Sequence, residues 1–134
     1  MGNVVYRVSP PVAHVDLKAL FTAAWPVHSP RDFQPVLSRS LTYVCAYAGL
    51  RLVGFVNVAW DGGIHGFVLD TTVHPDWRRR GIGRELVRKA ATLALERGLE
   101  WLHVDYEPTL ESFYQSCGFK RTAAGILQLR TDHD

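Results

Sequence analysis

The chain has 134 residues, of which 47% are hydrophobic and 21% are charged, and its formal net charge is +2. These values are typical of a soluble globular protein, and we expect residues 1–134 to form one domain with its own core. The small net charge argues against general nucleic-acid binding. No apolar run is long enough to cross a membrane, so we expect no membrane contact.

The two cysteines, Cys45 and Cys117, lie far apart and outside any CxxC motif. The N-terminus also lacks the charged and apolar regions of a signal peptide. These features predict a reducing, cytoplasmic location. The six histidines show no metal-ligand spacing, so we expect no bound metal.

Strand and helix patterns follow one another along the chain. The predicted elements of the first half are a strand at Val4–Val8, a helix at His14–Trp25, a short helix from Ser29-Pro30 to about Arg39, and strands at Leu41–Ala48, Leu52–Trp60 and Gly66–Val73. In the first helix, the residues expected on the apolar stripe are Val15, Ala19, Phe21 or Thr22, and Trp25.

The best-supported element is a helix after this last strand, with Ile82, Leu86 and Ala90 on its apolar stripe and Arg97-Gly98 at its end. The remaining predicted elements are a strand at Trp101–Tyr106, a short helix at Pro108–Cys117, and closing strands at Phe119–Thr122 and Ile126–Arg130. The order predicts an α/β (α+β) fold. Its sheet is mixed and mostly antiparallel, with six to seven strands flanked by about four helices.

A strand, a basic glycine-containing turn and a helix start lie together at Phe67–Val73 and Arg78-Arg79-Arg80-Gly81-Ile82-Gly83. The first N–H groups of a helix have no intrahelical partner and carry the positive end of its dipole. Glycine lets backbone approach a phosphate closely, and arginines add charged donors. This pattern predicts a pyrophosphate site. The rival interpretation is a nucleic-acid patch, but acidic residues follow closely and the charge is local.

The chain resembles the GNAT superfamily of N-acetyltransferases over nearly its whole length. Two motifs, in the order that the family has them, carry the resemblance. Arg78, Gly81 and Gly83 fill the family's phosphate signature of Arg or Gln, two residues, Gly, one residue, and Gly or Ala. Further on, Tyr114 is followed by three residues and then Gly-Phe, as in the family's late helix.

The resemblance implies an N-acetyltransferase that moves an acetyl group from acetyl-CoA to a primary amine by direct attack in a ternary complex. The implied pyrophosphate ligands are the backbone groups of Arg79, Arg80, Gly81, Ile82, Gly83 and Arg84. The strand end at Thr72 and Val73 would pair with the pantetheine arm as an added strand, with the Val73 N–H polarising the thioester carbonyl. Tyr114 would be the acid for the leaving thiolate.

The candidates for the general base are Asp70, Asp105 and Glu107, which lie in or after the two strands expected to flank the thioester. A water chain with no dedicated base is a further alternative. Strand alternation puts Val68, Asp70 and Thr72 on one face. Each carboxylate is a candidate base, a site for the substrate's positive charge, or a partner of an arginine. Glu107 stands where many relatives have an Asn that contacts pantetheine.

The acceptor is expected to be a small-molecule or peptide amine, and a homodimer is an open expectation. Trp25, Phe33 and Trp60 are candidates for the lining of the acceptor pocket. Packing in the hydrophobic core is the default interpretation for all three. The alternative function is a non-catalytic acyl-CoA-binding sensor or interaction module.

Overall fold

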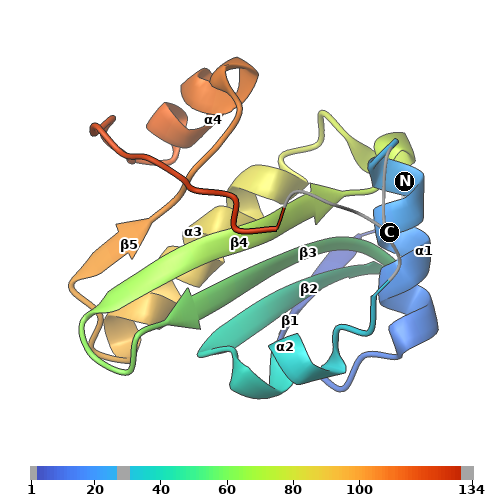
Figure 1. Cartoon of the computed structure of the whole chain (residues 1–134). Helices are drawn as coiled ribbons and strands as arrows, with labels where there is room; N and C mark the ends of the chain where they lie inside the picture. Colours follow the sequence, from blue (N-terminus) through green and yellow to red (C-terminus); the bar gives the residue numbers. More distant parts are fainter. Residues whose placement is uncertain (1–2, 27–30, 131–134) are drawn as a thin grey trace.

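The computed structural model of the chain describes residues 3–26 and 31–130. It contains a five-stranded sheet in the order β1-β2-β3-β4-β5, shown in Figure 1. The strands are β1 (Val4–Val8), β2 (Thr42–Ala48), β3 (Arg51–Trp60), β4 (His65–Val73) and β5 (Trp101–His103). Neighbours are antiparallel from β1 to β4, and β5 is parallel to β4. The predicted mixed, mostly antiparallel sheet is confirmed.

The described residues also form four α-helices and two short 3₁₀ helices. They are α1 (His14–Ala24), α2 (Gln34–Arg39), η1 (Pro75–Trp77), α3 (Ile82–Glu96), η2 (Pro108–Leu110) and α4 (Glu111–Ser116). The predicted helix start at Ser29-Pro30 lies outside the described residues. Helix α2 begins later, where the Gln34 N–H donates to Asp32 Oδ1 at 3.0 Å. No helix in the described ranges has both the length and the hydropathy to span a bilayer.

Helix α3 packs on one face of the sheet. Its buried residues are Ile82, Leu86, Val87, Ala90 and Ala94. Gly54 of β3 permits the close approach, because a Cβ atom there would lie 3.0 Å from Leu86 Cδ1 and 3.1 Å from Ile82 Cγ2. Valines of β2 and β3 complete this half of the core.

Helices α1 and α2 contribute to a second core cluster on the opposite face of the sheet. Leu17, Leu20 and Phe21 of α1 are buried there, at the i, i+3, i+4 spacing of a helical face. The predicted apolar stripe of this helix is confirmed at Phe21 and is wrong at Val15, which is 67% exposed, and at Ala19, which is also exposed.

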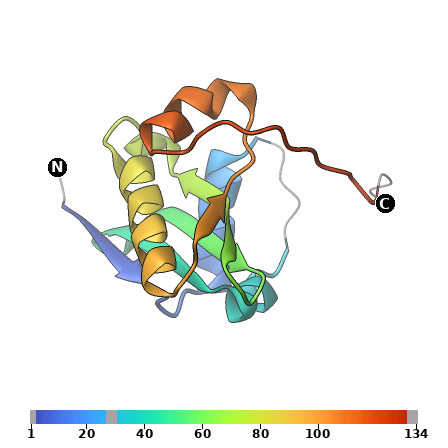
Figure 2. The same ribbon diagram turned by 90° about the vertical axis from the view of Figure 1, so that its left-hand side faces the viewer.

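The two closing strands predicted at Phe119–Thr122 and Ile126–Arg130 are absent from the described chain. Helix α4 ends at Ser116, Gly118 then adopts a φ of 100°, and residues 119–130 have no regular secondary structure. Figure 2 shows this segment running away from the sheet. The residues have the apolar alternation of strands, but a strand also needs a neighbouring strand to pair with, and none pairs with them within the described chain.

Replacing the fully buried Leu86 with alanine should lower the free energy of unfolding by about 2–5 kcal/mol, because the site loses both burial and packing. Leu95 lies on the same helix but is 73% exposed. Leu95→Ala should therefore change that free energy by less than about 0.5 kcal/mol. Urea unfolding followed by circular dichroism measures both. Equal losses in the two variants would contradict the packing of α3 described above.

Candidate functional site

The turn between β4 and α3 leaves the start of the helix without a side-chain cap. Residues Arg78–Gly81 follow η1, and Gly81 occupies the N-cap position with a φ of 79°. Glycine is favoured in this left-handed conformation, and it brings no side chain to the first helical turn. The first N–H groups of α3 are thus available to bind an anion, with the helix dipole in their favour.

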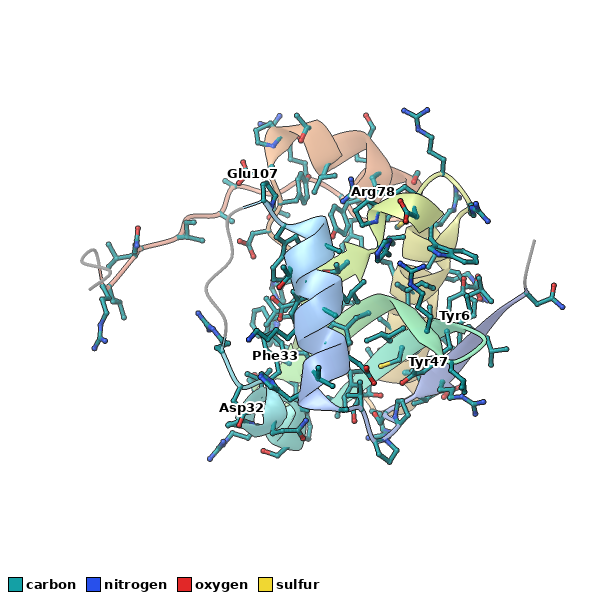
Figure 3. The ribbon with its side chains drawn as sticks, turned by 90° about the vertical axis from the view of Figure 1, so that its right-hand side faces the viewer. Tyr6, Asp32, Phe33, Tyr47, Arg78 and Glu107 are labelled. Carbon is teal, nitrogen blue, oxygen red and sulfur yellow. The ribbon has the colours of Figure 1, made fainter. Side chains whose placement is uncertain are left out.

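Two arginines of the predicted site hold this turn against the ends of neighbouring helices. Arg78 Nη2 donates to the carbonyl of Ala24, the last residue of α1, at 3.4 Å. Arg84 Nη2 donates to the carbonyl of Ser116, the last residue of α4, at 3.2 Å. Figure 3 shows Arg78 beside the upper end of α1. The basic cluster therefore positions the turn in addition to making it positive.

Gly83, in the first turn of α3, lies against α4 and β4. A Cβ atom at this position would meet Phe113 Cζ at 3.4 Å and Val73 Cγ2 at 3.6 Å. A methyl group fits at these contact distances, whereas a long side chain must displace Phe113 or extend over the turn.

One edge of β4 is open next to this turn. Strand β5 pairs with β4 at three positions, the last being Phe67 with His103. Beyond Phe67, no strand of the described chain pairs with β4 on that side. On its other side, His74 N donates to Val53 O at 2.8 Å, and Val73 is opposite Gly54. Because backbone groups alternate along a strand, the Val73 N–H points away from β3 and into the open gap.

A bulge in β4 sets this orientation. Leu69 is opposite Asn57 and Thr72 is opposite Phe55, so Asp70 and Thr71 together face a single residue of β3. Asp70 adopts a φ of 59°, and the Thr72 hydroxyl donates to the Asp70 carbonyl at 2.8 Å. The predicted shared face of Val68, Asp70 and Thr72 is wrong, because the bulge breaks the alternation. Val68 packs under α3, whereas Thr72 faces the α1 side with Phe55.

Tyr114 is buried at 6% exposure between other aromatic rings. It stacks on Tyr106 with ring centroids 5.2 Å apart and contacts Phe119 edge-on at 5.8 Å. Burial raises the pKa of its phenol, while the neighbouring Thr71 hydroxyl acts to lower it. The Tyr114 phenol is therefore protonated at neutral pH, the state that a general acid needs.

Sequence reasoning missed Thr71, the second residue of the bulge. Its Oγ1 is shielded from solvent, and its interaction with the Tyr114 phenol lowers the pKa of that phenol. The only signal in the sequence was a second threonine at the end of an apolar strand.

The three predicted carboxylates differ in their surroundings. Asp70 is partly buried, and burial raises its pKa, with Arg31 acting in the opposite direction. Asp105 and Glu107 are exposed. Asp105 is close enough to Tyr114 to raise the phenol's pKa, and Figure 3 shows Glu107 at the same end of the molecule as Arg78. Among the three, Asp70 is the carboxylate whose partial burial raises its pKa, and a raised pKa makes a carboxylate a better proton acceptor.

The aromatic candidates for an acceptor pocket mostly pack in the core. Phe33 is 7% exposed, with its ring centroid 5.0 Å from that of Phe21, and Trp25 stacks on Phe21 at 4.4 Å. Trp60 is 41% exposed at the end of β3. A shallow depression lies beside α2 instead, lined by Pro35, Val36, Arg39, Ser40, Asn57, Ala59 and Leu69.

His65, His74 and His103 contact other protein groups. His74 Nδ1 accepts from the Asp76 N–H at 3.1 Å, and its Nε2 lies 2.9 Å from Arg51 Nη2. His65 Nδ1 and His103 Nε2 are 2.9 Å apart across β4 and β5. Among residues 3–26 and 31–130, no three His, Cys, Asp or Glu side chains are placed to hold a metal ion together.

Comparison with known proteins gives matches to one family. The model of the acetyltransferase (GNAT) family matches residues 13–119. An uncharacterized N-acetyltransferase of Pyropia yezoensis, ycf52, is 27% identical over 79 residues, which make up 59% of this chain and 45% of that protein. A ycf52-like N-acetyltransferase of Prochlorococcus marinus is 32% identical over 69 residues, or 52% of this chain and 38% of that protein. The match thus spans less than half the length of these relatives.

Solved structures share the fold. The GNAT family acetyltransferase SP0256 from Streptococcus pneumoniae has a TM-score of 0.79 and 25% identity, covering 97% of this chain and 100% of that one. AAC(6')-Iy, solved in complex with the bisubstrate analog CoA-S-monomethyl-acetylneamine, has a TM-score of 0.78 at 19% identity, covering 98% of this chain and 100% of that one. Because the family model covers most of the chain, including the turn and the helix that carries Tyr114, this protein belongs to the acetyltransferase (GNAT) family.

Proposed function

We propose that this protein transfers an acetyl group from acetyl-CoA to a primary amine, by direct attack while both substrates are bound. The observation that carries the proposal is the open edge of β4, which directs the Val73 N–H into a gap beside the uncapped start of α3. The solved complex of AAC(6')-Iy with a CoA bisubstrate analog supports a CoA donor on this fold.

The residues of the turn and of β4 fit a CoA thioester. Backbone N–H groups of Arg79–Arg84 would bind the pyrophosphate, since they lie where the helix dipole is positive. The edge of β4 at Thr72 and Val73 would bind the pantetheine arm as an added strand. Acetyl-CoA supplies an acyl group activated as a thioester. The Val73 N–H would donate to the carbonyl oxygen as negative charge develops there.

Two side chains near the gap would handle protons. Tyr114 keeps its proton at neutral pH because burial raises its pKa, and it would donate that proton to the departing thiolate. Asp70 would accept a proton from the acceptor's ammonium group, directly or through water. The raised pKa of Asp70 makes it a better proton acceptor than an ordinary carboxylate.

The acceptor class that we propose is a small-molecule or peptide amine. The carboxylates Asp70, Asp105 and Glu107 favour a cationic one. AAC(6')-Iy was solved with an acetylneamine-based analog, and the aminoglycoside acetyltransferase meta-AAC0020 was solved with sisomicin. These two structures support a small amine on the same fold, and an aminoglycoside panel is a reasonable first assay.

Acetyl-CoA at about a hundred times its Kd should stabilise the fold by roughly 2.7 kcal/mol, measured as a rise in Tm. Gly83→Glu should abolish that rise, because a bulky anion would stand at the pyrophosphate position. Gly83→Ala is the matched control and should keep it, since a methyl group meets Phe113 at 3.4 Å. If excess CoA leaves the Tm of the wild-type protein unchanged, the turn is not a CoA site.

Tyr114→Phe should lower kcat by roughly a hundredfold or more, the usual scale for one proton-transfer group, with little change in acetyl-CoA affinity. Release of free CoA with a good acceptor is the measurement. Tyr106→Phe is the control, because Tyr106 stacks on Tyr114 and both changes keep the ring. Full kcat in the Tyr114 variant would show that the phenol only packs. Binding without CoA release from any amine tested would favour the acyl-CoA-binding module instead.

Asp70→Asn should lower kcat and raise the Tm at neutral pH. Since the folded-state pKa of Asp70 lies above its ordinary value, its ionisation costs stability, and that cost grows as pH rises between the two values. Asparagine removes the cost. The loss of kcat should shrink as pH approaches the acceptor's own pKa, because the amine then needs no base. Asp105→Asn and Glu107→Gln should mainly raise KM. Unchanged kcat in Asp70→Asn across this pH range would exclude Asp70 as the base.

A further inference from the structure

The depression beside α2 lies on the face of the sheet that carries α1 and α2. Its volume is about 300 Å³, at the lower end of the range for small-molecule pockets. The walls are mainly apolar, with Val36 from α2, Ala59 from β3 and Leu69 from β4. Leu69 is 38% exposed, so its side chain has room to contact a ligand. A hollow of this size and lining fits a compact apolar group.

The depression lies next to Asp70, on the same face of the sheet. Leu69 is opposite Asn57 in the antiparallel pair of β3 and β4, and Asp70 follows Leu69 at the bulge. Arg31, in the segment that leads into α2, acts to lower the pKa of Asp70. Because a charge acts most strongly on its near neighbours, the Asp70 carboxylate lies toward α2. An amine bound at Asp70 therefore has the depression beside it.

Asn57 brings a polar side chain to this apolar lining. It is 1% exposed, and the Ser40 hydroxyl donates to its Oδ1 at 2.5 Å. Within the described residues the Asn57 carboxamide makes no further hydrogen bond, so its amide nitrogen has no protein partner there. Buried polar groups are nearly always paired, which marks this carboxamide as a binding group for a ligand in the depression. A neutral hydroxyl or amide fits it, because a carboxamide both donates and accepts.

Arg39 sets the charge of the depression. Of the described residues that line it, Arg39 is the one that carries a charge, and its Nη1 donates to the Pro35 carbonyl at 3.3 Å. A second ammonium group on a ligand would leave water, meet the apolar walls and face this guanidinium. The depression therefore favours a ligand with an uncharged body, and it disfavours polyamines and aminoglycosides.

On the basis of the acetyl transfer proposed above, we propose that the depression beside α2 binds the body of the acceptor. The acceptor class is a monoamine with a compact apolar body that carries one neutral hydrogen-bonding group. The ammonium group binds at Asp70, and the neutral group bonds to Asn57. Between them, the apolar body contacts Val36, Ala59 and Leu69. Specificity then comes from the body of the acceptor as well as from its amine.

Calorimetric titration of the full-length chain with primary n-alkylamines, at neutral pH with and without CoA, tests this class without turnover. From methylamine to hexylamine, each added methylene should tighten binding about fourfold until the depression is filled. The diamine of the same length as hexylamine should bind at least about tenfold more weakly, because its second ammonium group meets the apolar walls. Equal affinity for these two ligands, or affinity independent of chain length, would overturn the proposal.

Ala59→Leu should fill part of the depression. It should weaken hexylamine binding by about tenfold or more, with little change for methylamine. The matched control is Ala91→Leu, the same change at an exposed position of α3 on the other face of the sheet, which should alter neither affinity. Unchanged hexylamine affinity in the Ala59 variant would show that the alkyl chain binds elsewhere.

Asn57→Leu removes the carboxamide at nearly constant size. In a set of amino alcohols that differ in the position of the hydroxyl, one should lose about fivefold more affinity than hexylamine does, the usual scale for one neutral hydrogen bond. Circular dichroism and the Tm check that this variant folds, and the two preceding tests do not depend on it. Equal losses for hexylamine and every amino alcohol would exclude Asn57 as a binding group.

Release of free CoA, measured with the same amines, keeps this proposal separate from acetyl transfer. Graded binding without CoA release would support the depression as an amine site and contradict the transfer reaction. CoA release at rates independent of chain length, with no graded binding, would support the transfer and overturn the depression as its acceptor site.

Discussion

One extra residue in β4, at Asp70 and Thr71, determines the geometry of the whole site. Without it, the alternation along β4 would direct the Thr72 N–H outward and the Val73 N–H toward β3. With it, the outward N–H belongs to Val73, whose side chain contacts the start of α3 at Gly83. The same bulge brings the Thr71 hydroxyl to Tyr114 and leaves Asp70 partly buried. A donor, an acid and a base candidate thus depend on a single backbone irregularity.

The proposed pyrophosphate site would use backbone N–H groups more than the side chains of Arg78 and Arg84. Arg78 and Arg84 are occupied by carbonyls at the ends of α1 and α4, where helix dipoles are negative and cations are stabilising. The turn is therefore fixed before any ligand arrives, so less entropy is lost on binding. Burial acts similarly on the two proton-transfer candidates, because it favours the neutral forms of both Tyr114 and Asp70.

Local signals made α3 and the turn predictable from sequence. A glycine at the helix start and apolar residues at helical spacing define α3 almost to the residue, because these signals act within a few positions. The bulge has no such signal, since Asp70 reaches a positive φ without glycine and its cause lies in the pairing with β3. The prediction of the two closing strands was wrong for a related reason. Periodicity at Ile126–Arg130 describes a strand, but it cannot name the edge that the strand joins.

The two edges of the sheet differ in stability, because β5 is joined to β4 by a shorter ladder than the one that joins β1 to β2. Five residue pairs join β1 to β2, whereas three join β4 to β5. The wall of the gap opposite Val73, which includes Tyr114, is held mainly by ring contacts with Tyr106 and Phe119. Such a wall can open as a local unit while the ladder from β1 to β4 stays intact. In the proposed transfer reaction, the ease with which these rings separate would set the length of acyl chain that the gap accepts, because a longer acyl group would take the place of ring contacts.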